Sequence, residues 1–305
     1  MRLPWLAVVT ACGAEAPPVE PPDDGQPVDL AAIPAGCVAD RAEADRLDET
    51  SLDQVRALYV TTSDGPDFAR DTDGTICNSL RGVATWFHDQ TGQFLRFDTA
   101  DGLIDIGFVR LPITDEAMRG TDPGNQTLDL GHAFVRERIE RELITSPNKL
   151  YAVYYEGTSS YACGGGAYPP LIVGRVGAMY LRAQPPGQPD PCDALPWGRA
   201  SLTPGYVDYG ILHELVHSLG LVPPSSSNQH SVGHVFDVAS ATPARDLMYS
   251  PRPAMPDPFW AVTDPAGLVL DLGSDDYYDT GAADDLATSS LLSPLPASAH
   301  RPVGW

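Results

Sequence analysis

The segment Tyr206–Gly220, YVDYGILHELVHSLG, constrains the fold more than any other part of this sequence. Its apolar residues cover most of a helical wheel, and a helix that is apolar on nearly all sides has to be buried in a larger protein. Three polar side chains, His213, Glu214 and His217, nevertheless lie in its middle. Burying them without partners is costly, so the sequence predicts a buried helix whose polar groups share a specific task.

The spacing of these polar residues predicts a metal site. Residues four apart on a helix lie on the same face, so His213 and His217 can present two nitrogens to one zinc ion at about 2.0–2.1 Å each. Glu214 lies too far around the helix to be a third ligand but can reach a metal-bound water. In this HExxH pattern zinc acidifies the water, and the carboxylate takes its proton during attack on a carbonyl. We therefore expect Glu214 to be the catalytic base.

The ends of the helix are also marked in the sequence. Thr203 can cap a helix, and Pro204 is tolerated in a first turn. Gly220 is a residue type with which helices commonly end. We therefore expect the helix to begin just after Thr203 and to end at Gly220.

The region from the helix onward resembles the metzincins, a clan of zinc peptidases with the motif HExxHxxGxxH and a downstream Met-turn. The matching residues are His213, Glu214, His217, Gly220 and the run Asp246-Leu247-Met248-Tyr249. An acidic stretch, Asp275–Tyr278, is a further similarity to bacterial secreted members. The resemblance implies an α+β fold of the zincin or metzincin type, in which a twisted mixed sheet carries an active-site helix followed by a Met-turn.

The third metal ligand departs from the metzincin motif. The position that should hold a histidine is Pro223, and two histidines, His230 and His234, follow after an insertion. We favour His234, because Gly233 allows close approach and Asp237 is available as a partner for an imidazole N–H. His230 is the alternative, and Asp237 as a direct ligand is a further one.

The resemblance also assigns roles to two residues of the Met-turn. It implies that Met248 packs beneath the metal, although an ordinary core methionine would make similar contacts. It makes Tyr249 a candidate contact for the substrate oxyanion. Family members that use such a tyrosine place it one position further along the chain.

The rest of the chain has short strand and helix patterns. Strand candidates are residues 55–61, 94–98, 105–111, 150–155 and 171–181, and helix candidates are residues 76–90 and 130–144. Strands and helices do not alternate strictly, which favours an α+β fold over a doubly wound sheet.

The N-terminus indicates export. Residues 1–12 have a basic start, a short apolar stretch and a lipobox-like Val9-Thr10-Ala11-Cys12, so we expect a signal peptide and a lipid anchor on Cys12. Residues 13–35 contain six prolines and five acids, which suits an extended tether. Residues 36–305 are expected to form one domain. The protein would be a cell-surface or periplasm-facing lipoprotein, or secreted, with no membrane contact besides the anchor.

The cysteines agree with export. Apart from Cys12, four of the five cysteines remain, an even number that suits an oxidising compartment. Of the three possible pairings we favour Cys37–Cys77 with Cys163–Cys192, because these bonds close the two shorter loops. The run of three glycines after Cys163 is expected to form a disulfide-anchored turn, which would lie near the substrate cleft.

The charge balance limits the partners. A net charge of −22 disfavours nucleic acid, which has the same sign. Calcium binding by the Asp clusters is a less favoured explanation of the negative charge than a solvated acidic surface. The run Asp71-Thr72-Asp73-Gly74 resembles part of a calcium loop but lacks its bidentate glutamate, so we interpret it as a polar turn. The sequence leaves the oligomeric state open.

The function that follows is a zinc-dependent endopeptidase acting on a peptide or protein substrate. An alternative from another class is a non-catalytic surface-binding or adhesion lipoprotein whose zinc is structural. The intact Glu214 favours catalysis, because a structural site needs no general base. Hydrolysis of another amide or an ester would use the same residues.

Overall fold

The computed structural model describes thirteen stretches of the chain. They are residues 32–119, 131–143, 146–159, 162–167, 173–185, 189–195, 197–198, 202–219, 222–230, 233–235, 246–249, 267–282 and 285–301. The signal and lipobox expected at residues 1–12, most of the tether expected at 13–35, and Gly220 and Asp237 lie outside these stretches. Those expectations, and the domain boundary at residue 36, stay predictions.

The centre of the fold is a five-stranded mixed sheet with the strand order β5-β1-β6-β8-β7. The first four strands of this order are mutually parallel, and β7 pairs antiparallel with β8 at one edge. The strands are β1 (Gln54–Thr61), β5 (Ile106–Arg110), β6 (Lys149–Tyr155), β7 (Gly164–Gly165) and β8 (Val176–Tyr180). Every residue of β1 and β6 is buried, as expected for parallel strands covered on both faces.

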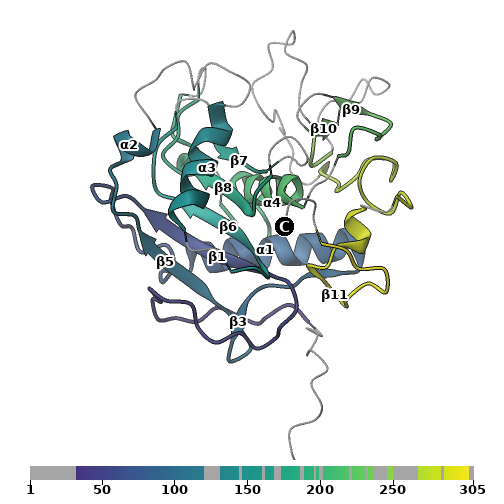
Figure 1. The fold of residues 1–305 in the computed structure, drawn as a ribbon, viewed down its shortest axis with the longest axis horizontal. Helices are drawn as coiled ribbons and strands as arrows, with labels where there is room; N and C mark the ends of the chain where they lie inside the picture. The colour runs from purple at the N-terminus through teal and green to yellow at the C-terminus, as the bar shows by residue number, and fades with distance from the viewer. Residues whose placement is uncertain are drawn as a thin grey trace, which may run out of the picture.

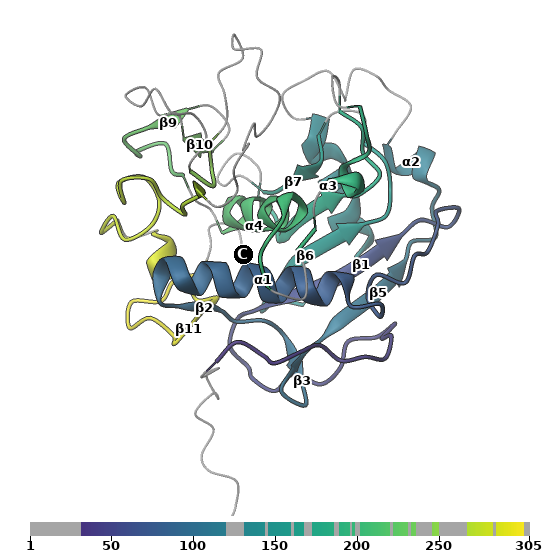
Figure 2. The ribbon, with the colours of Figure 1, turned by 180° about the vertical axis from the view of Figure 1, so that it is seen from behind.

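Helices cover both faces of this sheet (Figures 1 and 2). The helices α1 (Thr75–Thr91) and α4 (Tyr206–Ser218) lie on one face, and α3 (Gly131–Glu142) lies on the other. Alternate residues of β6 face opposite layers, so Tyr154 bonds to Ser79 of α1 while Tyr155 contacts Tyr180 on the other side. The expected α+β class is confirmed, and the expected strands and helices overlap the observed ones.

Short elements surround the sheet and its covering helices. They comprise α2 (Asp115–Arg119) and the strand pairs β3 (Thr99–Ala100) with β4 (Leu103–Ile104), β2 (Phe94–Leu95) with β11 (Leu292–Ser293), and β9 (Gln229–His230) with β10 (His234–Val235). Two 3₁₀ turns cover Cys192–Ala194 and Leu286–Thr288. The C-terminal stretch from residue 285 is fixed by the buried Arg96, which donates to the carbonyls of Asp53, Ser290 and Leu292.

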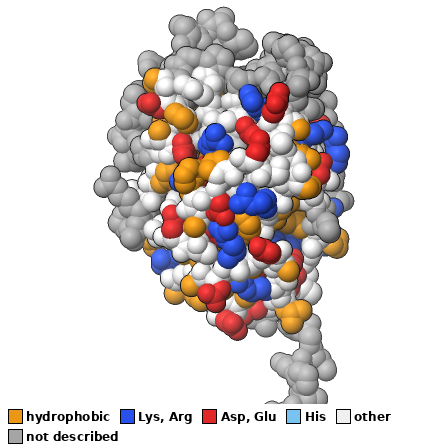
Figure 3. All heavy atoms as spheres, turned by 90° about the vertical axis from the view of Figure 1, so that its left-hand side faces the viewer, with side chains coloured by type: hydrophobic (Ala, Val, Ile, Leu, Met, Phe, Trp, Pro, Cys, Tyr) orange, Lys and Arg blue, Asp and Glu red, His pale blue; other side chains and the backbone are white. Residues whose placement is uncertain are grey.

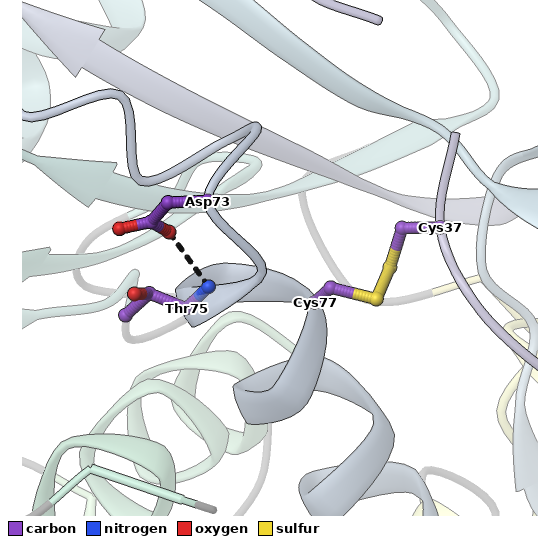
Figure 4. Close-up of a disulfide and its surroundings, with 4 residues drawn as sticks. All are labelled: Cys37, Asp73, Thr75 and Cys77. Atoms are coloured by element: carbon purple, nitrogen blue, oxygen red, sulfur yellow. Dashed lines mark hydrogen bonds between the residues drawn. A yellow bond between two sulfur atoms is a disulfide. The ribbon is translucent and has the colours of Figure 1, made fainter. Parts of the chain in front are cut away.

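Both expected disulfides are present. Cys37 bonds to Cys77 and thereby joins the N-terminal stretch to α1 (Figure 4), and Cys163 bonds to Cys192. Beside the first bond, Asp73 accepts a hydrogen bond of 2.8 Å from the backbone N–H of Thr75 at the start of α1. This confirms two covalent links of the kind found in proteins of oxidising compartments.

The run 71–74 is a polar turn, as the sequence indicated. Gly74 has a φ of 89° and precedes the first residue of α1. The carboxylate of Asp71 is bound by the guanidinium of Arg41 at 2.7 and 2.8 Å, and Arg41 also bonds to Asp67. A cationic side chain therefore already neutralises this acidic turn.

The surface carries charges of both signs. Figure 3 shows acidic and basic side chains intermixed on one face of the molecule, with hydrophobic side chains scattered between them. Within the described stretches, no helix combines the length and the apolar composition needed to cross a bilayer.

Candidate metal site

The helix α4 carries the two histidines of the HExxH pattern and is buried almost completely. All residues from Val207 to Ser218 are buried, which confirms the expectation from its apolar surface. The expected start was wrong: the helix begins at Tyr206, with the extended Gly205 before it. The carboxylate of Asp208 accepts the N–H of Gly205 at 2.6 Å and so closes the first turn in place of a threonine cap.

Two glycines bring this helix close to the sheet. A Cβ atom on Gly177 of β8 would lie 2.9 Å from the backbone of Glu214, and one on Gly210 of α4 would lie 2.6 Å from Sδ of Met179. At position 177 the overlap is with backbone, so only glycine permits this approach there, whereas at position 210 the side chain of Met179 would have to move. The close contact fixes the height of Glu214 above the sheet.

Three histidine side chains converge beside α4. The Nε2 atom of His234 lies 3.2 Å from Nε2 of His213 and 3.1 Å from Nε2 of His217. His213 and His217 are 2 % and 6 % exposed, and His234 is partly buried. The structure therefore brings together the three residues favoured as ligands. His230 pairs with His234 through the backbone, and its side chain lies outside the description.

The geometry of these nitrogens fits a tetrahedral metal ion. Ligand nitrogens about 2.0–2.1 Å from zinc lie about 3.3 Å from one another in a tetrahedron, close to the two measured separations. In addition, Nδ1 of His213 lies 2.7 Å from the carbonyl oxygen of Leu247. A carbonyl only accepts, so Nδ1 donates in this bond, and in the neutral tautomer the lone pair of Nε2 would face the other two histidines.

Glu214 is buried under the edge strand β7. A Cβ atom on Gly164 would lie 2.5 Å from its Oε1 atom, and a Cβ atom on Gly166 would lie 3.2 Å from Oε2 and 2.7 Å from Cβ of His217. Burial raises the pKa of Glu214 to about 8, while the charge of Arg136 and a hydrogen bond from the Gly166 backbone lower it. The arrangement provides a desolvated carboxyl group that is able to accept a proton.

Residues 246–249, which the resemblance implies to be the Met-turn, support the histidines through their backbone. The carbonyl of Leu247 accepts from His213, and the carbonyl of Met248 accepts the N–H of Val235 at 2.9 Å, directly after His234. Met248 is fully buried. Tyr249 is partly buried in the same turn, and its role at an oxyanion stays a prediction.

The sequence did not reveal the contacts around Glu214. The run of glycines after Cys163 forms strand β7 rather than a turn, and the Cys163–Cys192 disulfide anchors the start of this strand. The Gly166 N–H and the charge of Arg136 on α3 act on Glu214 from elements remote in sequence. Three consecutive glycines were the only signal of such a close approach.

One acidic cluster is already neutralised by cations. The carboxylates of Asp45, Asp98 and Asp105 lie close enough together to bind a metal ion. However, the ammonium group of Lys149 bonds to Asp45 and Asp98, and the guanidinium of Arg56 bonds to all three carboxylates. Both cationic side chains are buried, so this cluster is an ion-pair network.

A second acidic cluster forms hydrogen bonds within a loop. The carboxylates of Asp271, Asp275 and Asp276 are also near one another. One oxygen of Asp271 accepts the backbone N–H groups of Asp276, Tyr277 and Tyr278 at 3.2, 2.8 and 2.8 Å. These bonds shape the turn that contains Asp276, and calcium binding here stays an untested expectation.

Comparison with known proteins assigns no family. A scan against protein-family models finds no match, and a search of curated proteins finds no similar chain. The metzincin resemblance therefore rests on residues 213–249.

Proposed function

We propose that this protein is a zinc-dependent endopeptidase with Glu214 as its general base. The observation that carries the proposal is the convergence of His213, His217 and His234, with Nε2 separations of 3.1 and 3.2 Å, beside a buried carboxyl group. The mixed sheet, with α4 against it and the Met-turn residues behind His213, is compatible with the zincin-type fold that the resemblance implies.

The three histidines would hold the zinc ion, which as a Lewis acid polarises a carbonyl and lowers the pKa of water. Glu214 would take a proton from the attacking water and deliver it to the leaving nitrogen of the peptide bond. The close contacts with Gly164 and Gly166 hold the carboxyl group in one orientation.

A peptide is the preferred substrate class because of the neighbouring edge strand. β7 is the last strand in the described sheet and lies directly over Glu214. An edge strand offers backbone groups on its outer side, and an extended peptide can pair with them. Such pairing would align a peptide bond with the carboxyl group.

The buried carboxyl group of Glu214 also favours the peptidase proposal over the adhesion alternative. A purely structural zinc site needs three or four ligands and no desolvated carboxyl group beside them. Here the fold holds Glu214 with a backbone hydrogen bond and close glycine contacts. We also propose that the protein is exported, since its two disulfides are compatible with an oxidising compartment.

The test is hydrolysis of casein by the full chain with stoichiometric zinc. We expect Glu214→Gln to retain zinc and to lose about 10²- to 10⁴-fold in activity, the usual contribution of a general base. Glu116→Gln, at an exposed position on α2, is the matched control and should keep wild-type activity. Equal hydrolysis by wild type and Glu214→Gln, or none by either, would contradict the proposal.

A further inference from the structure

The third histidine of the site does not belong to the helix that carries the other two. His213 and His217 are fixed by the packing of α4, whereas His234 lies on the short antiparallel pair β9–β10, hereafter the ribbon. The ribbon has only two paired positions, His234 with His230 and Val235 with Gln229. Such a short ribbon is not stable alone, so other contacts have to fix His234.

One of these contacts is a buried carboxylate that binds the residue before the ribbon. Asp276 is 4 % exposed, and its two oxygens accept the backbone N–H and the side-chain amide of Asn228 at 2.8 and 3.0 Å. Ser226 also donates its hydroxyl to the backbone carbonyl of Asp276 at 2.5 Å. Asn228 directly precedes β9, so this two-point contact sets the position and direction of the ribbon.

The same loop also holds the turn behind His213. Tyr277, next to Asp276, donates its hydroxyl to the buried carboxylate of Asp246 at 2.9 Å. Asp246 also accepts the N–H groups of Met248 and Leu272, both at 2.7 Å. The carbonyl of Leu247 accepts a hydrogen bond from Nδ1 of His213, and the carbonyl of Met248 accepts one from the ribbon backbone. Residues 271–278 therefore connect both sides of the histidine cluster.

We propose that Asp276 is a positioning residue for the third ligand, which sets zinc affinity by orienting the ribbon that carries His234. This inference rests on the proposed function, because it requires zinc at the three histidines. Within the described residues the side chain of Asp276 bonds to Asn228 and not to the histidines, so it takes no part in the chemistry. Groups that orient a ligand commonly change metal affinity 10- to 100-fold when removed.

The experiment measures the zinc dissociation constant of the full chain by competition with a chromophoric chelator. We expect Asp276→Ala to raise the dissociation constant about 10- to 100-fold. Asp275→Ala removes the adjacent, exposed carboxylate and should leave it unchanged. Both variants change the net charge equally, so a difference between them reports on the contact with Asn228.

A second set of variants separates positioning from a general effect on folding. In a His234→Ala background, Asp276→Ala should not weaken zinc binding further, because the ligand that Asp276 positions is absent. If Asp276→Ala is insoluble, Asn228→Ala removes one of the two hydrogen bonds and should raise the dissociation constant about 3- to 10-fold.

Two results would overturn the inference while leaving the proposed function intact. One is wild-type zinc affinity in Asp276→Ala, or in Asn228→Ala where that variant replaces it. The other is an effect of the same size with and without His234. By contrast, a wild-type protein that binds no zinc would refute the proposed function itself, and with it this inference.

Discussion

The substitution Gly164→Ala tests whether the edge strand positions Glu214, the proposed general base. A Cβ atom at this position would lie 2.5 Å from Oε1 and 2.9 Å from Cγ of Glu214, and 3.0 Å from the carbonyl oxygen of Ala178. Non-bonded contacts involving carbon are favourable at about 3.5 Å and beyond. The carboxyl group would therefore have to move by about 1 Å, because the carbonyl is fixed within the sheet.

This displacement sets the expected magnitude. A misplacement of about 1 Å at a reacting group can cost about 100-fold in rate, which corresponds to about 2.7 kcal/mol of activation free energy. The same overlap should lower the free energy of unfolding by about 1–3 kcal/mol. Zinc content should not change, because the atoms nearest to this position belong to Glu214 and Ala178 and not to a histidine.

The assay combines kcat/KM on a fluorogenic peptide, zinc content and urea unfolding. Gly82→Ala is the matched control: its Cβ atom would meet no neighbour closer than 3.7 Å, so activity and fold should be kept. In a Glu214→Ala background most of the destabilisation by Gly164→Ala should disappear, because Oε1 and Cγ are gone. Full activity of Gly164→Ala, or undiminished destabilisation in that background, would refute the reasoning.

Three further predictions concern stability. Removal of zinc by chelation should lower Tm by about 5 °C or more, since ligand at 100 times its Kd stabilises by about 2.7 kcal/mol, and calorimetry with and without chelator measures this. Replacing both Cys163 and Cys192 by alanine should cost about 3–4 kcal/mol for a bond spanning 29 residues, and should lower peptidase activity because β7 loses its anchor. Arg96→Met should lower the free energy of unfolding by about 3 kcal/mol or more, because three buried carbonyls lose a charged donor; an unchanged urea midpoint would contradict this.

The sequence predicted those features that depend on local pattern. The apolar surface of Tyr206–Ser218 predicted a buried helix, and the four-residue spacing placed His213 and His217 on one face. Loop length was enough to favour the correct cysteine pairing. In each case the information lies within one element or in a simple count along the chain.

Features that depend on tertiary contacts could not be predicted in this way. The helix start was misplaced because Asp208 reaches back to Gly205, which competes with the cap expected from Thr203. The sequence favoured His234 because Gly233 and Asp237 lie near it in the chain. The residue that we propose to position it, Asp276, lies 42 residues further along the chain. No pattern in a single sequence links residues at such a separation.

These tertiary contacts also bear on the proposed metzincin resemblance, from whose spacing the third histidine departs. The motif would place the third histidine at Pro223, but His234 follows His217 by 17 residues, so the connecting chain is roughly threefold longer. Closing a flexible loop of that added length costs only about 1 kcal/mol. A hydrogen bond to a charged group contributes about 1.5–3 kcal/mol, and Asp276 makes two to Asn228. The two hydrogen bonds between Asp276 and Asn228 can therefore offset the free energy of closing the longer loop. The position of His234 then does not depend on a fixed number of residues between it and α4.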